Sequence, residues 1–385
     1  MDAANFPTPN GRFEYNSQQR LTFVPKKLPP AIKYDDNLMM ALVRAERKVG
    51  ELEGICNEIQ KPYILIKAHM RKEAVLSSKI EGTLTSLEDF NRHEAVGDIE
   101  KTEMEYLRLR EVINYVHALD ASMVGMDGGD RMSLVLLRKA HKKLLYKVRG
   151  EDKSPGMFRD IQNMIVSESG AKKEVIYMPP SAEMVRELLD DLESFFQAEN
   201  KDVSPLVQCA MIHYQFEAIH PFRDGNGRIG RLILPLLLYE RKILTTPLLY
   251  LSEYFEEHRE EYYAGLMAVS QKSQWYEWIE FFLEAFSEQA ERTIKSIKGL
   301  QGLREKYKKT LMEKRRSSKA VFLLDHIVSN PYMTIPMAQK ILNVTYPTAK
   351  TAVTALVDAG ILTEVETVMA KRVFMAQEIS EIFQS

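Results

Sequence analysis

Residues 220–231 read HPFRDGNGRIGR, and this stretch decides how the rest of the chain is interpreted. It stands between two strongly apolar segments, yet it contains almost nothing that a core would bury. Pro221 disfavours the α conformation at His220, because its ring collides with the backbone of the preceding residue. We therefore expect a helix over 204–219 to end at His220 and another helix to begin near Gly227.

The glycines and arginines of this stretch predict an anion-binding site. Gly225, Asn226 and Gly227 can turn successive backbone N–H groups toward one point, and the N-terminus of the next helix adds positive potential there. Arg228 and Arg231 are three residues apart, so on a helix they share a face and can both reach phosphate oxygens.

Two further side chains complete the predicted site. Asp224 offers a hard oxygen ligand, and one carboxylate plus substrate phosphates is the usual way in which proteins hold Mg²⁺, with Mn²⁺ as the alternative. His220 has an ordinary pKa of about 6.5, which suits proton uptake from a hydroxyl near neutral pH. Each residue alone would be read as a turn, a solvated helix face or a loop histidine, but their coincidence at fixed spacing favours catalysis.

A metal site is the alternative interpretation of the same region. His213, Glu217 and His220 are spaced four and three residues apart, which can place them on one helix face. The sequence has no HExxH motif, and the neighbouring arginines would repel a cation. We therefore expect His213 to be a hydrogen-bonded structural residue that supports the loop.

The stretch resembles the signature of the Fic family, HPF-x-(D/E)-GNGR-x-x-R, at every fixed position. In that family the loop joins two helices of an all-α core and AMP is transferred from ATP to a protein hydroxyl. The resemblance implies that His220 is the general base and that Asp224 holds Mg²⁺. It also implies a set of phosphate contacts, made by Gly225, Asn226, Gly227, Arg228 and Arg231.

The segment SSKIEG at 77–82 matches a second Fic pattern, the inhibitory motif (S/T)-x-x-x-E-(G/N), through Ser77, Glu81 and Gly82. In such relatives the glutamate pairs with the last arginine of the signature. The resemblance thus implies an ion pair between Glu81 and Arg231, in which the carboxylate takes the place of a terminal phosphate. How far the same glutamate supports removal of AMP stays open.

A short β-like run at 175–177, which is followed by two prolines, lies where Fic proteins carry a hairpin flap. An exposed strand edge there can pair with an extended target segment through main-chain hydrogen bonds. Tyr177 and Met178 are the expected contacts. A hairpin simply packed on the core is an alternative of equal weight.

Periodicity indicates a mainly α protein, in which an all-α Fic core with a small β-hairpin flap precedes a C-terminal winged helix-turn-helix domain. The expected divisions are an arm and helical region with the inhibitory helix at 1–90, a catalytic core at 91–302, a basic linker at 303–318 and the winged domain at 319–385. Within the first region, residues 1–35 are expected to be an extended arm.

The pattern of the tail predicts three short helices at 320–328, 335–342 and 346–359, followed by two strands. DNA binding through phosphate contacts is one expectation for this domain. It would use cations of the third helix, the wing and the linker, namely Lys350, Lys371, Arg372, Lys308, Lys309, Lys314, Arg315 and Arg316. Docking of a protein, or of a second copy of the chain to give a homodimer, is the alternative.

The bulk composition excludes several classes of protein. The 385 residues carry a net charge of only −2, which excludes a polycation that binds nucleic acid with its whole surface. Cys56 and Cys209 are far apart in sequence, so neither a disulfide framework nor a cysteine-rich zinc site fits. The longest apolar run, at 232–239, is too short to cross a bilayer. No signal peptide pattern is seen, and we expect a cytoplasmic protein without a membrane partner.

These observations predict a protein adenylyltransferase that uses ATP and Mg²⁺. It would modify a Ser, Thr or Tyr hydroxyl of a protein target, itself included, and release pyrophosphate, with Glu81 as its restraint. Two alternatives stay open. One is a DNA-binding regulator whose nucleotide site is a sensor, and the other is transfer of a different phosphate-linked group.

Overall fold

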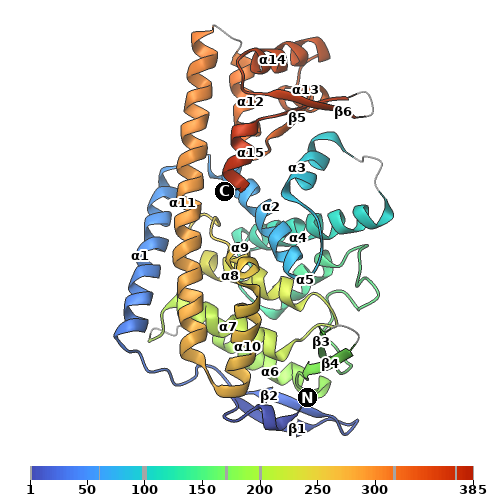
Figure 1. The fold of residues 1–385 in the computed structure, drawn as a ribbon, viewed down its shortest axis with the longest axis vertical. Coiled ribbons are helices and arrows are strands. Elements are labelled where there is room, and N and C mark those ends of the chain that lie inside the picture. The colour runs from blue at the N-terminus through green and yellow to red at the C-terminus, as the bar shows by residue number, and fades with distance from the viewer. Residues whose placement is uncertain are drawn as a thin grey trace.

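The computed structural model describes residues 2–59, 61–97, 102–169, 172–198, 202–314, 318–368 and 371–384. In these residues helices dominate, and the strands form three small antiparallel sheets. Helix α11 (Trp275–Glu313) runs along the longest axis of the molecule (Figure 1). The hairpin of β1 (Gly11–Tyr15) and β2 (Leu21–Pro25) lies at one end, and the C-terminal elements lie at the other.

Residues 1–35 were expected to form an extended arm, but they contain this hairpin instead. β1 and β2 pair in register from Gly11 with Pro25 to Tyr15 with Leu21. Phe23 of β2 is fully buried, and its ring lies 6.0 Å from that of Tyr177. The apolar partner of the hairpin therefore comes from a distant part of the chain, which explains why the local composition did not reveal it.

The N-terminal half is helical, and polar caps set where several helices begin. Ser86 and Thr102 form capping boxes, and Asp35 accepts a hydrogen bond from the backbone N–H of Leu38. The helices of this half are α1 (Asp36–Glu58), α2 (Pro62–Ile80), α3 (Leu87–Val96), α4 (Glu103–Asp127) and α5 (Leu134–Leu144). α1 packs along α11.

The predicted loop joins two helices of the core. α7 (Pro205–Ile219) ends where proline was expected to end it, and His220 follows in the left-handed conformation with φ 49°. α8 (Asn226–Glu240) begins one residue before the predicted start. Around them lie β3 (Ile165–Ser169), β4 (Lys172–Tyr177), α6 (Val185–Gln197), α9 (Ser252–Glu257) and α10 (Arg259–Lys272).

The C-terminal part contains the three predicted helices and two predicted strands, together with two elements that were not predicted. The predicted elements are α12 (Ser318–Ser329), α13 (Ile335–Leu342), α14 (Tyr346–Asp358), β6 (Thr363–Val368) and β7 (Lys371–Met375). The additional ones are β5 (Tyr332–Thr334) and α15 (Gln377–Gln384). The strand order is β5-β7-β6. The assignment as a winged helix-turn-helix stays a prediction.

The beginning of the expected linker, residues 303–313, forms the end of α11. Arg315 and Arg316 lie outside the described residues. Buried apolar side chains form one contiguous cluster that joins α11 to the C-terminal helices and to α2, and Leu311, Leu323 and Phe383 belong to it. The division of the chain into four domains stays a prediction.

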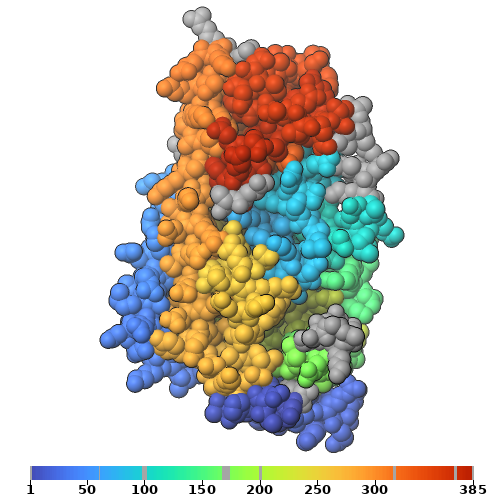
Figure 2. Space-filling model, in the orientation of Figure 1, coloured from blue at the N-terminus to red at the C-terminus, as the bar shows by residue number. Residues whose placement is uncertain are grey.

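The C-terminal elements rest against α2 and α3, and Figure 2 shows their surface in close contact with that of the α3 region. Arg71 donates to the carbonyl of Ser329 at 2.6 Å, and Asn330 donates to that of Asn91 at 3.0 Å. None of the described helices combines the length and apolar character that a bilayer span requires.

Candidate active site

Phe222 and Asn226 close the loop between α7 and α8. The Asn226 side chain accepts from the Phe222 N–H at 2.8 Å and donates to the Phe222 carbonyl at 2.8 Å. The Phe222 ring is fully buried and stacks on the His141 ring, with 3.8 Å between the ring centroids. Because its side chain is used in this way, Asn226 has only its backbone N–H left for an anion.

His220 is held from both sides. Its Nδ1 lies 3.1 Å from the side-chain nitrogens of Asn163 and Asn226, and its carbonyl accepts from Arg159 Nε at 2.8 Å. Burial, followed by the nearby Arg159 charge, lowers the pKa of His220 to about 4. The imidazole is therefore neutral at pH 7, so it needs no prior loss of a proton before it accepts one.

Arg159 is a site residue that sequence reasoning missed. It is 3% exposed, and its Nη2 donates to the carbonyls of Pro180 at 2.6 Å and Ile219 at 3.2 Å. One guanidinium thus connects the segment after β4 to the C-terminal end of α7. A cation is stabilising there because the C-terminal end of a helix carries partial negative charge. It stands in a stretch without helical or strand periodicity, so its position offered no signal.

His141 was also missed, although it fixes the position of Asp224. Its Nδ1 accepts from the Gly156 N–H at 2.8 Å, so Nε2 carries the hydrogen and donates to the Asp224 carbonyl at 2.9 Å. Burial lowers the pKa of His141 to about 4, which keeps this arrangement neutral. In the sequence it is one histidine on an amphipathic helix, so nothing distinguished it.

The carboxylate of Asp224 offers the hard oxygen ligands that Mg²⁺ prefers. Its Oδ1 accepts from the Gly225 N–H at 2.6 Å. Its Oδ2 faces Gly150, where a Cβ would lie 2.9 Å away. Among the described residues no group of three or more His, Cys, Asp or Glu side chains could hold a metal. A single carboxylate completed by phosphate oxygens and water is the usual Mg²⁺ arrangement, and Asp224 fits that role.

Arg228 is 1% exposed and lies between two carboxylates, 3.6 Å from Glu111 Oε2 and 3.6 Å from Asp224 Oδ1. Its Nε and Nη1 are buried and have no hydrogen-bond partner within the described ranges. Burying a donor without an acceptor costs free energy, so an oxygen from outside the chain that accepted from Nε or Nη1 would be stabilising. Arg231 contacts Ser77 and Glu81 at the end of α2, and the charges of both Arg228 and Arg231 lower the pKa of Glu81.

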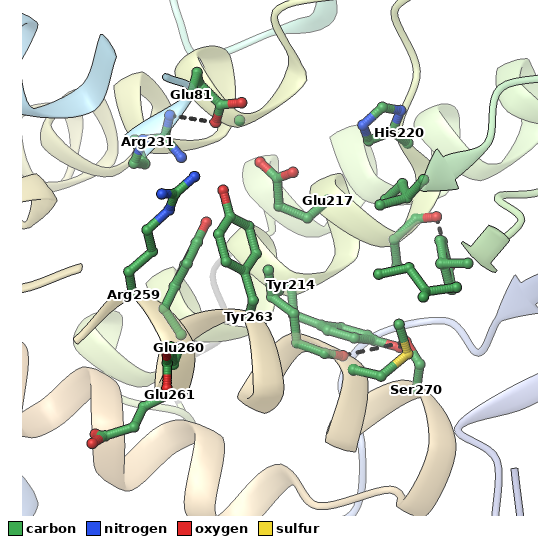
Figure 3. A pocket seen from close by; sticks show the side chains of 18 of the residues that line it. Glu81, Tyr214, Glu217, His220, Arg231, Arg259, Glu260, Glu261, Tyr263 and Ser270 are labelled. Atoms are coloured by element: carbon green, nitrogen blue, oxygen red, sulfur yellow. Dashed lines mark hydrogen bonds and ion pairs between the residues drawn. The ribbon is translucent and has the colours of Figure 1, made fainter. Parts of the chain in front are cut away.

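The expected pair of Glu81 and Arg231 is present (Figure 3). Arg231 Nη2 donates to Glu81 Oε1 at 2.8 Å, and its Nε donates to Ser77 Oγ at 2.9 Å. Burial is the largest single influence and would raise the pKa of Glu81, but the charge and hydrogen bond of Arg231, together with the charges of Arg228 and His220, hold this pKa below its ordinary value. Glu81 is the C-cap residue directly after α2, and Gly82 follows with φ +87°.

Two glycines of α8, about one turn apart, each have a glutamate carboxylate packed directly against the backbone. A Cβ at Gly227 would collide with Glu81 Oε1, and a Cβ at Gly230 would collide with Glu217 Oε1. Glu81 thus covers the N-terminus of α8, the place where the sequence predicted an anion. This carboxylate also uses the positive helix end that a phosphate would use.

Glu217 and His213 do not form the alternative metal site. Both ring nitrogens of His213 are used, Nδ1 with the Gly230 carbonyl at 3.0 Å and Nε2 with the Tyr262 hydroxyl at 2.7 Å. His213 is thus hydrogen-bonded as expected, but its partners lie on α8 and α10 and not in the loop. Glu217 Oε1 is buried and has no hydrogen-bond partner in the described residues. Burial raises the pKa of Glu217 to about 8, so the group is mainly neutral at pH 7.

A cavity of about 1130 Å³ opens beside the loop, between α7, α8, α10 and the β3–β4 hairpin. It falls somewhat above the usual range of ligand sites, about 300–1,000 Å³. The predicted residues that line it are Glu81, Tyr177, His220, Gly227 and Arg231. The other loop residues named above lie outside its lining.

The expected hairpin is present, but Tyr177 and Met178 lie at its packed foot. They are 4% and 6% exposed. The Tyr177 hydroxyl donates to the Ala218 carbonyl at 2.9 Å, and the Met178 carbonyl already accepts from the Phe23 N–H at 2.9 Å. Ile176, which is 39% exposed and lines the cavity, is the more accessible side chain.

The cations expected on the wing are used within the chain. Lys371 donates to the Val96 carbonyl at 2.9 Å, and Arg372 pairs with Glu364. The exposed side of α14 adds Lys350. Of these described cations only Arg372 is paired with a carboxylate, and DNA binding by the C-terminal elements stays a prediction.

Comparison with known proteins places this geometry in a family. Residues 39–123 match the sequence model described as Fic/DOC family N-terminal, and residues 131–238 match that of the Fic/DOC family. A relative from Aquifex aeolicus, named probable protein adenylyltransferase, is 30% identical over 98 residues, which are 26% of this chain and 30% of the relative. The protein adenylyltransferase fic-1 of Caenorhabditis elegans is 36% identical over 93 residues, 23% of this chain and 17% of the relative.

Solved structures agree with the fold. A Fic family protein from Desulfovibrio desulfuricans G20 superposes with a TM-score of 0.59 at 20% identity, over 90% of this chain and 98% of that one. C. elegans Fic-1 gives a TM-score of 0.54 at 23% identity, over 68% of this chain and 74% of that one. The sequence matches thus span less than a third of each curated relative's own length, whereas the fold extends over most of the chain. The chain belongs to the Fic/DOC family.

Proposed function

We propose that this chain transfers AMP from ATP to a hydroxyl group of a protein. The observation that carries the proposal is the convergence of His220, Arg231 and the N-terminus of α8 on one cavity, where a carboxylate, Glu81, occupies the anion position. The relatives named protein adenylyltransferase support the same activity. ATP is then a substrate, and the protein target, which can be a copy of this chain, is the other.

In the proposed reaction the hydroxyl oxygen of the target attacks the α-phosphorus of ATP. His220 takes the hydroxyl proton, the bond from the α-phosphorus to the bridging oxygen breaks, and pyrophosphate leaves. Negative charge on the α-phosphate is stabilised by the backbone N–H groups of Asn226 and Gly227 and by the helix N-terminus, whereas the Gly225 N–H, also expected to contribute, donates to Asp224 Oδ1. The unpartnered donors of Arg228 lie beside the same loop and suit the phosphate chain.

Asp224, with its free Oδ2 beside Gly150, would hold Mg²⁺ or Mn²⁺ against the phosphates. The metal would neutralise charge on the phosphate oxygens. The chain itself supplies the position of the carboxylate, which His141 fixes through the Asp224 carbonyl.

Glu81 restrains the reaction in this proposal. It occupies both Arg231 and the backbone at Gly227, so a terminal phosphate has to displace it before ATP can lie in line with the attacking oxygen. The proposal leaves open how far the Glu81 carboxylate also supports removal of AMP from a modified protein. A cytoplasmic location agrees with Cys56 and Cys209, which are both free and buried.

Labelled nucleotides test the proposal directly. ATP labelled at the α-phosphorus should transfer its label to protein, whereas label at the γ-phosphorus should stay in solution as pyrophosphate. His220→Ala should abolish transfer and still bind ATP. Transfer of the γ-label, or of label from a different phosphate-linked donor only, would replace the proposal with another group transfer.

A further inference from the structure

We propose that Arg259 is a positioning residue that holds the inhibitory glutamate on Arg231. The inference rests on the function proposed above, in which Glu81 restrains the site. Arg259 is the first residue of α10, and its Nη2 donates to the carbonyl of Ile80 at 2.7 Å. Ile80 is the last residue of α2 and directly precedes Glu81.

Two guanidinium groups hold the last turn of α2. Arg231 donates to the Ser77 carbonyl at 2.9 Å, at the beginning of this turn, and Arg259 takes the Ile80 carbonyl at its end. The two carbonyls between them accept backbone N–H groups of the capping turn. The last carbonyls of a helix lack intrahelical partners and carry its negative end, so a cation there is stabilising.

Arg259 is fixed on its own helix as well. Its guanidinium carbon lies 5.8 Å from the ring centroid of Tyr263, one turn further along α10. Both side chains line the cavity that contains Glu81 (Figure 3). No carboxylate pairs with Arg259 in the part of the chain that the structure describes, so the Ile80 carbonyl is its recorded hydrogen-bond acceptor.

The position of Ile80 decides whether Glu81 reaches its partner. The Glu81 carboxylate is 2.8 Å from Arg231 and rests on Gly227, so little displacement is tolerated. Hydrogen bonds of this type lengthen out of their normal range beyond about 3.2 Å. Releasing the Ile80 carbonyl frees the end of α2 and lets the carboxylate leave Arg231 more often.

A neighbouring ion pair provides a matched control. Lys79, in the same turn of α2, pairs with Glu256 of α9 at 2.8 Å, and its side chain is 48% exposed. Exposed pairs contribute little, since solvent screens them. Glu256→Ala therefore removes a contact between the same turn of α2 and the neighbouring helix α9 without freeing a carbonyl of α2.

The experiment measures AMP transfer from α-labelled ATP by the full chain. The variants are wild type, Arg259→Ala, Glu81→Gly, the double variant and Glu256→Ala. Arg259→Ala should raise transfer roughly three- to tenfold, in line with the loss of one hydrogen bond of ordinary strength. In the Glu81→Gly background the same substitution should change nothing, because the group that it positions is gone. Glu256→Ala should match wild type.

Each outcome has one meaning. If Glu81→Gly fails to raise transfer, the proposed restraint is wrong. If it does raise transfer but Arg259→Ala does not, only the role of Arg259 is overturned. Reduced transfer by Arg259→Ala in the Glu81→Gly background would make Arg259 a substrate-binding residue instead. Arg259→Lys, which keeps a cationic donor for the Ile80 carbonyl, should return transfer toward wild type and carries the test should the alanine variant not fold.

Discussion

The carboxylate of Glu81 rests directly on Gly227 in the first turn of α8, while its Oε1 accepts from Arg231 at 2.8 Å. One group thereby covers two places that the proposed function assigns to a nucleotide, a guanidinium and a helix N-terminus. Its departure frees both at once. Several of the expected effects of substitution follow from this double contact.

Glu81→Gln should weaken the contact with Arg231 but keep a side chain of the same shape packed against Gly227. The amide keeps the shape of the side chain and can still accept a hydrogen bond from Arg231, but it loses the negative charge, so the ion pair becomes a weaker bond between a cation and a neutral amide. We expect transfer activity between those of wild type and Glu81→Gly, and a stability loss of about 1 kcal/mol, since Glu81 is partly exposed. Activity assays and urea unfolding measure the two. Equal activity of the Gln variant and wild type would contradict the charge argument.

Transfer should depend on pH through His220. Its pKa is lowered to about 4, so the ring can accept a proton throughout the neutral range and loses that ability only in acid. The acid side of the pH–rate profile should stay flat down to about pH 5 and fall below it. Loss of the base in His220→Ala should cost about 10²–10⁴-fold. An acid limb centred near pH 6.5 would mean that the ring is not desolvated in the working enzyme.

Nucleotide affinity should fall in alkaline solution because of Glu217. The group is neutral below its raised pKa of about 8 and becomes a carboxylate above it, which adds negative charge beside Arg231. In a Glu81→Gly background, calorimetry with ATP should show weaker binding at pH 9 than at pH 7. Glu217→Gln, which cannot ionise, should remove the difference. An unchanged difference in that variant would assign the effect to another group.

Stability should also decrease as the solution becomes acidic. Burial lowers the pKa values of four histidines, His69, His141, His213 and His220, to about 3 or 4. In the unfolded chain they take up protons near pH 6.5, whereas in the folded chain they do not. The unfolded state therefore binds more protons between about pH 6.5 and 4, and the free energy of unfolding falls as pH drops through that window.

Urea unfolding at pH 7 and pH 5 measures this decrease. His69→Gln is a suitable control, because His69 is buried in α2 outside the lining of the active-site cavity. It should make the stability less dependent on pH and leave the pH–rate profile unchanged. Identical pH dependence in wild type and this variant would show that His69 is not buried in neutral form.

Asp224→Asn should remove most of the stimulation by divalent metal. The amide keeps the hydrogen bond from the Gly225 N–H but is a weaker ligand for Mg²⁺ than a carboxylate. We expect roughly a hundredfold loss of transfer, a few kcal/mol of charge stabilisation. Titration of activity with Mg²⁺ checks it. Full activity of the variant at ordinary Mg²⁺ would show that Asp224 is not a ligand.

The local parts of the site could be predicted from the sequence. The end of α7 and the start of α8 follow from Pro221 and the glycines, and the pairing of Glu81 with Arg231 was implied by the resemblance of two motifs to those of the Fic family. These features depend on neighbouring residues or on a recurring pattern, which is the information that a single sequence contains.

The remaining parts depend on long-range packing. Arg159 and His141 act on backbone carbonyls of the loop, and nothing in their own neighbourhoods indicates which carbonyls those are. The burial of Tyr177 arises because β2, from the other end of the chain, covers it. A side chain expected at an exposed flap edge is therefore part of a packed aromatic cluster.

Helix α11 gives the molecule a strut. Its 39 residues, at about 1.5 Å per residue, measure about 58 Å. It runs from the hairpin end of the molecule to the C-terminal elements, so the separation of these ends is set by a single rod of backbone hydrogen bonds. Two fluorophores attached at the two ends of α11 should therefore report the same distance between them in every step of turnover.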